Sequence, residues 1–145
     1  MYSAVEIAKF VITFCAEMGK PISNLHLQKI LYYLQVHFAK QGRQLYNEEI
    51  YAWQYGPVVP EIYYLFAGYG ACKIINRYET SIDANIRAEI EEVVKKLIEI
   101  SPWELVRMTH TKGDPWDKTY NDGSGINDVI DFGLLQSDSM GDVWA

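Results

Sequence analysis

Glycine and proline residues interrupt the amphipathic pattern of the N-terminal sequence, and a helix cannot continue through these interruptions. They therefore limit the length of the helices that the chain can form. Before the first interruption, residues 3–18 carry apolar side chains at helical spacing on one face: Ala4, Ile7, Ala8, Val11, Phe14, Cys15 and Met18. Ser3 and Glu6 match a capping box, in which each side chain satisfies a free backbone N–H of the first turn. Gly19 and Pro21 then end the helix. The pattern predicts one amphipathic helix over residues 3–18.

A second amphipathic helix is predicted directly after this break. Ser23 or Asn24 caps its start, and Gly42 ends it after about Gln41. Its apolar stripe consists of Leu27, Ile30, Leu31, Leu34 and Phe38. Because the linker between the two helices is short, we expect them to pack as an antiparallel pair.

The pattern changes to a period of two near residues 49–55. Ile50, Ala52 and Gln54 alternate there with Tyr51, Trp53 and Tyr55, which predicts a short strand. Pro57 and Pro60 prevent a longer strand, because proline has no N–H for a sheet ladder. Pro60 suits the first position of a third helix, over about residues 60–68.

The C-terminal half alternates between helical patterns and loops. We expect helices over residues 82–100 and 101–109, a long loop over residues 110–125, and a short helix from Asn127 or Asp128 to Phe132. The predicted fold is mainly α: a compact single domain of five to six helices, residues 1–135, with a small β element near residues 49–55. We expect residues 136–145 to form a loose polar tail.

Composition fits one globular, cytoplasmic domain. The chain has 145 residues, of which 49% are hydrophobic and 22% charged. No stretch is apolar enough for a transmembrane helix, and the N-terminus lacks the basic start of a secretory signal. Cys15 and Cys72 fit no redox or metal spacing. We therefore expect a cytoplasmic location and no membrane association.

The distribution of charge makes nucleic acid an unlikely partner. The net charge is −6, and residues 48–145 carry 17 Asp/Glu against eight Lys/Arg. Residues 1–47 carry five Lys/Arg against two Asp/Glu, so a weak case for DNA stays open. The first two helices and their turn have the outline of a helix-turn-helix. Helix two contains no arginine, and its polar side chains are Asn24, Gln28, Lys29 and Gln35 among others.

We find no arrangement of residues typical of catalysis or of metal binding. Cys15 lies on the apolar face of helix one, where packing is the usual role of a cysteine. His26 and His37 are about three helical turns apart and do not share one metal ion. We predict that the chain is not an enzyme and binds no cofactor. An enzyme that uses His110 with Asp114 or Asp117 remains a minor alternative.

Tyrosine is unusually frequent, with 11 residues, and two pairs are adjacent. Surface tyrosines favour protein contacts, because they bury a large area at a small cost in side-chain entropy. We predict a partner-binding surface that consists of Gln28, Lys29, Tyr32, Tyr33, Gln35, Tyr63 and Tyr64. The alternative is that the helix-two side chains bind internally and tie the helix to the strand.

Three segments in order, "ISNLHLQKILYYLQ", "YAWQYGPVVPEIY" and "WELVRMTHTKGDPW", give the chain a resemblance to a known family. It resembles the Panacea domain family, which includes SocA-like antitoxins, over about residues 3–132. The segment Lys112-Gly113-Asp114 departs from the usual family pattern, so we transfer no role to this loop.

The resemblance implies an antitoxin that binds and neutralises a cognate protein toxin. One branch of the family acts as a proteolytic adaptor, so a protease complex is a further implied partner. A DNA-binding regulator of its own operon is the alternative function. We expect the motif residues to build the shape of the domain: Trp53, Gly56, Pro57, Pro60, His110, Pro115 and Trp116.

Overall fold

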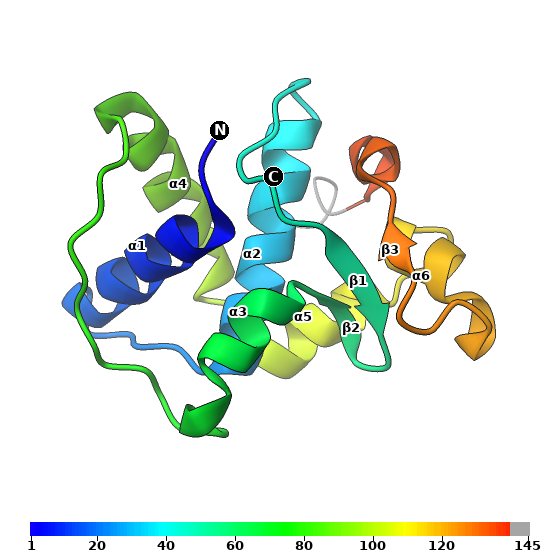
Figure 1. Cartoon of the computed structure of the whole chain (residues 1–145), viewed down its shortest axis with the longest axis horizontal. Coiled ribbons are helices and arrows are strands. Elements are labelled where there is room, and N and C mark those ends of the chain that lie inside the picture. The colour runs from blue at the N-terminus through cyan, green and yellow to red at the C-terminus, as the bar shows by residue number, and fades with distance from the viewer. Residues whose placement is uncertain (140–145) are drawn as a thin grey trace.

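The computed structural model describes residues 1–139, which form a mainly α-helical domain around one central helix (Figure 1). The central helix, α2 (Asn24–Ala39), contacts other helices and one strand of a small sheet. Within the described residues the other α-helices are α1 (Ala4–Glu17), α3 (Pro60–Leu65), α4 (Ala84–Leu97), α5 (Pro102–Thr109) and α6 (Pro115–Tyr120). The predicted fold class, a mainly α domain with a small β element, is confirmed.

Helices α1 and α2 begin at the predicted caps. The Ser3 hydroxyl accepts a hydrogen bond from the Glu6 N–H at 3.1 Å, and the Ser23 hydroxyl accepts one from the His26 N–H at 3.3 Å. Figure 1 shows α1 and α4 on one side of α2 and the sheet on the other. Because α2 is enclosed in this way, nearly all of its side chains are buried, whatever their polarity. No helix among residues 1–139 combines the length and the apolar character needed to cross a membrane.

The β element is a three-stranded antiparallel sheet in the order β2–β1–β3. Strand β1 (Ile50–Trp53) pairs with β2 (Gly56–Val58) through a tight hairpin, and with β3 (Val129–Ile130) on its other edge. Pro57 is compatible with this sheet because β2 is an edge strand, where a missing N–H breaks no ladder.

The predicted helix from Asn127 or Asp128 to Phe132 is wrong. This segment contains β3, in which Ile130 lies opposite Ile50, and a 3₁₀ helix, η3 (Phe132–Ser137), follows it. Asn127 takes a left-handed φ of 67°, which a helix does not permit. The segment therefore forms a strand, because it pairs with the edge of β1 that β2 leaves free.

The predicted loop over residues 110–125 contains the short helix α6. Pro115 occupies its first turn, and Trp116 is buried with 5% of its surface exposed. The indole Nε1 of Trp116 donates a hydrogen bond to the Trp53 carbonyl at 2.9 Å. Helix α6 is thereby fixed to β1.

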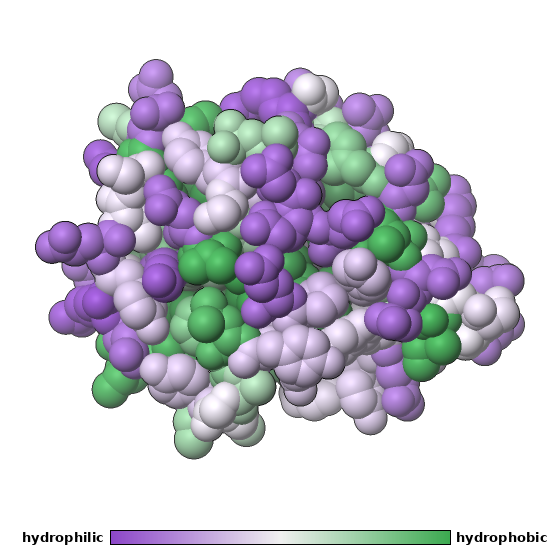
Figure 2. Space-filling model, in the orientation of Figure 1, coloured by the Kyte–Doolittle hydropathy of each residue, from purple (hydrophilic) through white to green (hydrophobic). Residues whose placement is uncertain are grey.

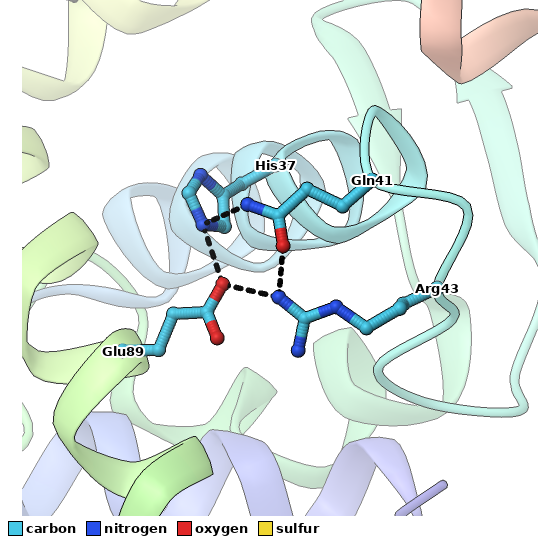
Figure 3. Close-up of polar contacts among 4 residues, drawn as sticks. All are labelled: His37, Gln41, Arg43 and Glu89. Atoms are coloured by element: carbon cyan, nitrogen blue, oxygen red, sulfur yellow. Dashed lines mark hydrogen bonds and ion pairs between the residues drawn. The ribbon is translucent and has the colours of Figure 1, made fainter.

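A polar cluster joins the C-terminal end of α2 to α4 (Figure 3). Glu89 of α4 lies 2.8 Å from the Nε2 atom of His37 and accepts a 2.5 Å hydrogen bond from Arg43. Burial raises the pKa of Glu89, but the hydrogen bonds and charges of Arg43 and His37 outweigh this effect and lower it. Gln41 contacts both His37 and Arg43, so four side chains hold this corner of the fold.

The first residues of the predicted loose tail are packed against the domain. The Tyr32 hydroxyl donates a 2.6 Å hydrogen bond to the carboxylate of Asp138, which is 2% exposed. Ser139 donates to the Asp114 carboxylate from its backbone N–H and from its hydroxyl. The expected loose tail is therefore wrong for residues 136–139, because a buried tyrosine hydroxyl requires an acceptor. Residues 140–145 lie outside the described residues.

Candidate partner-binding site

The predicted exposed stripe on helix two is not exposed. Five of the seven residues predicted to bind a partner have at most 2% of their surface exposed: Gln28, Lys29, Tyr32, Tyr33 and Gln35. The polar atoms of four of them, Gln28, Lys29, Tyr32 and Gln35, bind other parts of the fold, so the alternative of internal hydrogen bonds is correct for these four residues. The physical reason is that other elements surround α2 and leave it no face toward solvent.

The amides at the start of α2 position the hairpin exit and α3. Asn24 Nδ2 donates to the Tyr63 carbonyl at 3.0 Å, and Gln28 Nε2 donates to Asn24 Oδ1 at 3.1 Å. Gln28 Oε1 in turn accepts from the Val59 N–H at 2.9 Å. Val59 is the residue that precedes Pro60, the first residue of α3. A chain of buried amides therefore fixes α3 at both ends.

A cleft of ≈ 750 Å³ opens beside this network. Its walls come from the start of α2, the β1–β2 hairpin, the segment 63–71 and residues 126–127. Such a volume is typical of ligand pockets, in which a few polar groups lie among apolar and aromatic walls. Here the walls include Trp53, Tyr55, Tyr63 and Tyr64, and Lys29 also lines the cleft.

Five aromatic side chains at and next to the cleft form what we call the aromatic surface: Trp53, Tyr55, Tyr63, Tyr64 and Trp103. Tyr64 is 66% exposed and Trp103 is 63% exposed. Figure 2 shows pale, weakly hydrophilic atoms between α3 and the hairpin, below the centre of the molecule, and hydrophobic atoms over the left part of α3. An exposed group of large rings of this kind is typical of a protein-contact site.

The rings of the aromatic surface support one another. Trp53 makes an edge contact with Tyr63, with ring centroids 5.2 Å apart, and lies 6.0 Å from Tyr64. Tyr55 makes a perpendicular contact with Trp103 at 6.1 Å. Such contacts restrict the rings before any partner binds, which lowers the entropy cost of binding.

The motif residues occupy the places that join the hairpin to the helices. Trp53 is half-buried rather than fully buried, and its indole Nε1 donates to Asn127 Oδ1 at 3.0 Å. Gly56, Pro57 and Pro115 are buried, and Pro60 is half-buried. The backbone of Trp53 holds Trp116, whereas its ring lines the cleft.

Among residues 1–139, no carboxylate pairs with His110. Its Nδ1 atom lies 2.6 Å from the Val106 carbonyl, and its ring centroid is 3.8 Å from that of Trp116. Asp114 accepts hydrogen bonds from Ser139, and Asp117 accepts one from the Gly113 N–H. The hypothesised pair of His110 with Asp114 or Asp117 is therefore not formed.

Two further sequence hypotheses are resolved by burial. Burial raises the pKa of the Cys15 thiol to about 12, which agrees with its predicted packing role. The four polar side chains that a recognition helix would direct at DNA bases are at most 4% exposed: Asn24, Gln28, Lys29 and Gln35. Helix α2 therefore cannot read a major groove in the way that the helix-turn-helix hypothesis requires.

Lys29 is the most unusual residue at the cleft. Its Nζ atom donates to the Pro57 carbonyl at 2.9 Å, and burial lowers the pKa of the amine to about 7. In the unfolded chain the same amine has a pKa near 10.4. Between about pH 7 and 10 the unfolded state therefore binds more protons than the folded state at this site.

We expect this difference to make the protein more stable as the pH rises from 7 to 9.5. The free energy of unfolding should increase by up to about 1 kcal/mol per pH unit relative to Lys29→Met, which keeps the apolar stem but does not titrate. Urea titrations of both proteins at a series of pH values measure this slope. Equal slopes for the two proteins would show that Lys29 is not held with a lowered pKa.

Sequence reasoning missed Trp103 and Asn127. Trp103 lies outside the buried face of α5, which consists of Leu105, Val106, Met108 and Thr109. A large aromatic residue out of phase with an apolar stripe is a signal that was available. The contact of Asn127 with Trp53 joins residues 74 positions apart, and no local pattern indicates it.

Comparison with known proteins shows the family to which the chain belongs. The model of the family described as "Antitoxin SocA-like, Panacea domain" matches residues 27–117, which contain most of α2, the hairpin, α3, α4 and α5. Antitoxin SocA from Caulobacter vibrioides (strain NA1000 / CB15N) is 35% identical over 135 residues, covering 83% of this chain and 71% of the relative. No solved structure gives a significant match. The chain therefore belongs to the family of SocA-like antitoxins with a Panacea domain.

Proposed function

We propose that this protein is a cytoplasmic antitoxin that binds a cognate protein toxin and neutralises it through the aromatic surface. The observation that carries this proposal is the group of exposed, mutually supported rings beside the cleft. Tyrosine and tryptophan are the side chains that most often supply binding energy at protein interfaces. Of the seven residues predicted to bind a partner, Tyr63 and Tyr64 belong to this surface and remain in the proposal.

The support beneath the rings favours binding without rearrangement. The backbone of α3 is fixed by Asn24 at one end and by Gln28 through Val59 at the other. Pro60 restricts the first turn of the same helix. A rigid backbone that carries partly restricted rings loses little entropy when a partner covers it.

Membership of an antitoxin family supports a toxin as the partner. The aromatic surface favours direct binding, and a bound toxin is also what delivery to a protease would require. The two routes differ in the fate of the toxin. Direct inhibition leaves the amount of toxin unchanged, whereas an adaptor lowers it after protein synthesis is stopped.

Neutralisation in cells tests the proposal. Antitoxins of the family that this chain resembles are typically encoded beside their toxins, so the candidate toxin is the protein encoded by the adjacent gene. It is expressed from an inducible promoter, together with the wild-type chain or with Tyr64→Ala. We expect growth with the wild-type chain and a clear loss of protection with Tyr64→Ala. The melting temperature of this variant should stay within about 2 °C of wild type, because Tyr64 is 66% exposed. Ile75→Ala, at a residue that is 70% exposed and does not line the cleft, is the matched control.

Full protection by a folded Tyr64→Ala chain at the lowest protective expression level would contradict the proposed surface. Immunoblots of the toxin after a block of protein synthesis separate inhibition from delivery to a protease. A stable toxin level in protected cells indicates direct inhibition.

A further inference from the structure

The cleft has an electrostatic character opposite to that of the whole chain. The net charge of the chain is −6, yet among the described residues that line the cleft there is no Asp or Glu. Lys29 is the one Lys or Arg residue in that lining. A group that enters the cleft therefore meets aromatic walls, amides and a single cation.

The Lys29 amine is short of partners for a buried group. An ammonium has three N–H donors, but within residues 1–139 the one protein hydrogen bond of Lys29 is to the Pro57 carbonyl. Only 2% of Lys29 is exposed, so water contributes little to satisfying its two remaining N–H donors. A buried cation without a counter-charge is unfavourable, and packing alone would be served better by an apolar side chain of the same length.

The neighbouring amides do not compete for a ligand at this point. Asn24 and Gln28 already use their side chains to hold the Tyr63 carbonyl and the Val59 N–H. Gly56 lies directly beside the amine, because a Cβ placed on Gly56 would stand 3.1 Å from Lys29 Nζ. The missing side chain at residue 56 leaves space beside the amine, next to the Thr109 hydroxyl.

We propose that the cleft receives an acidic side chain, Asp or Glu, of the bound toxin, and that its carboxylate pairs with the Lys29 ammonium. This inference rests on the proposed function, since it names the group of the toxin that the same site recognises. The cleft opens between α3 and the hairpin, so a toxin segment lies across the rings and directs one side chain toward the floor. Charge complementarity selects a carboxylate over an amide or an apolar group.

Proton uptake accompanies this pairing. The amine has a pKa of about 7 without a partner, and a carboxylate beside it favours the charged form and raises the pKa. Of the other titratable side chains on the surrounding elements, Tyr55, Tyr63 and Tyr64 line the cleft with Lys29. Those that do not line it are Tyr51 of β1, Glu61 of α3, Glu104, Arg107 and His110 at α5, and His26, Tyr32, Tyr33 and His37 of α2. The proposed carboxylate lies beside the Lys29 amine, so the pairing changes the charge of this amine between pH 7 and 8.5.

Calorimetry with the purified product of the adjacent gene tests the inference. We expect Lys29→Met to weaken binding at pH 7 at least tenfold, and Lys95→Met, an exposed lysine of α4, to leave it unchanged. Wild-type affinity should fall several-fold between pH 7 and 8.5, while that of Lys29→Met stays flat. One Asp→Asn or Glu→Gln substitution in the toxin should reproduce the loss and add nothing to Lys29→Met.

The outcomes separate this inference from the proposed function. No binding by the wild-type chain would overturn both. Weaker binding by Tyr64→Ala together with wild-type affinity and pH dependence for Lys29→Met would overturn the lysine contact alone. A loss that follows removal of the C-terminal residue of the toxin, rather than any Asp or Glu substitution, would overturn the assignment to a side chain.

A second measurement requires no variant. The pKa of the Lys29 amine is followed by NMR of the labelled side chain, in the free chain and in the complex. We expect the pKa to rise by at least one unit on binding. An unchanged value in a formed complex would contradict the contact.

Discussion

Replacing Gly56 with alanine is expected to lower the free energy of unfolding by about 3 kcal/mol, one of the largest single-residue effects in this fold. Gly56 has a φ of 114°, a region that side chains other than glycine rarely adopt. An added Cβ would also stand 2.9 Å from Thr109 Oγ1, which is closer than two such atoms normally approach. Strain and overpacking each contribute on the order of 1–3 kcal/mol.

Gly68→Ala is the matched control for this variant. Gly68 has no heavy atom within 4 Å of an added Cβ and its φ is not positive, so we expect a change within about 0.5 kcal/mol. Chemical denaturation of both variants measures the difference. If Gly56→Ala is as stable as Gly68→Ala, the hairpin does not lie against α5 as described.

Gln35→Ala is expected to cost about 2–4 kcal/mol of stability. The side chain is 1% exposed, and its Oε1 accepts a 2.8 Å hydrogen bond from the Leu45 N–H while Nε2 donates to the Tyr46 carbonyl. Alanine leaves the buried Leu45 N–H without an acceptor and also leaves a cavity. Both effects act in the same direction.

Gln44→Ala separates burial from the hydrogen bond itself. Gln44 is exposed and donates to the same Tyr46 carbonyl at 3.0 Å. The Gln44→Ala substitution therefore removes a similar hydrogen bond from a side chain that is in contact with water. We expect a cost below about 1 kcal/mol. Equal losses for the two glutamines in denaturation experiments would be inconsistent with a buried Gln35.

Local signals predicted the elements that depend on local chemistry. Ser3, Ser23 and Ser101 cap helices because their hydroxyls reach a backbone N–H three residues later, a contact that sequence spacing alone specifies. Pro57 did not end the strand as the sequence predicted: β1 ends at a turn over Gln54 and Tyr55, and Pro57 lies in the edge strand β2 opposite Ala52. The α6 helix was missed although Pro115 is a favourable first residue, because glycine and aspartate around it indicate a loop.

The surroundings of α2 were not available from the sequence. The spacing of Gln28, Tyr32 and Gln35 indicates a second face of the helix, but it does not reveal whether that face meets solvent or protein. In the fold, Gln28 meets Val59, Tyr32 meets Asp138 and Gln35 meets Leu45. The partner of Tyr32 is 106 positions away, so only the tertiary structure shows that this polar face is internal.

The candidate site was predicted only in part for the same reason. Tyr63 and Tyr64 were identified by their adjacency, which prevents both from facing the core. The cleft beside them requires the hairpin, α3 and residues 126–127 to come together, and the Trp53–Asn127 contact that joins them is not local.

The dissociation constant of the complex with the protein encoded by the adjacent gene tests the central claim most directly. It is measured for the wild-type chain, the double variant Tyr63→Ala/Tyr64→Ala and the control Ile75→Ala, each checked for an unchanged melting curve. We predict that the double variant binds at least 30-fold more weakly, which corresponds to about 1 kcal/mol per tyrosine, while the control binds like wild type. A folded double variant that binds the toxin with wild-type affinity would contradict the claim that the aromatic surface holds the toxin.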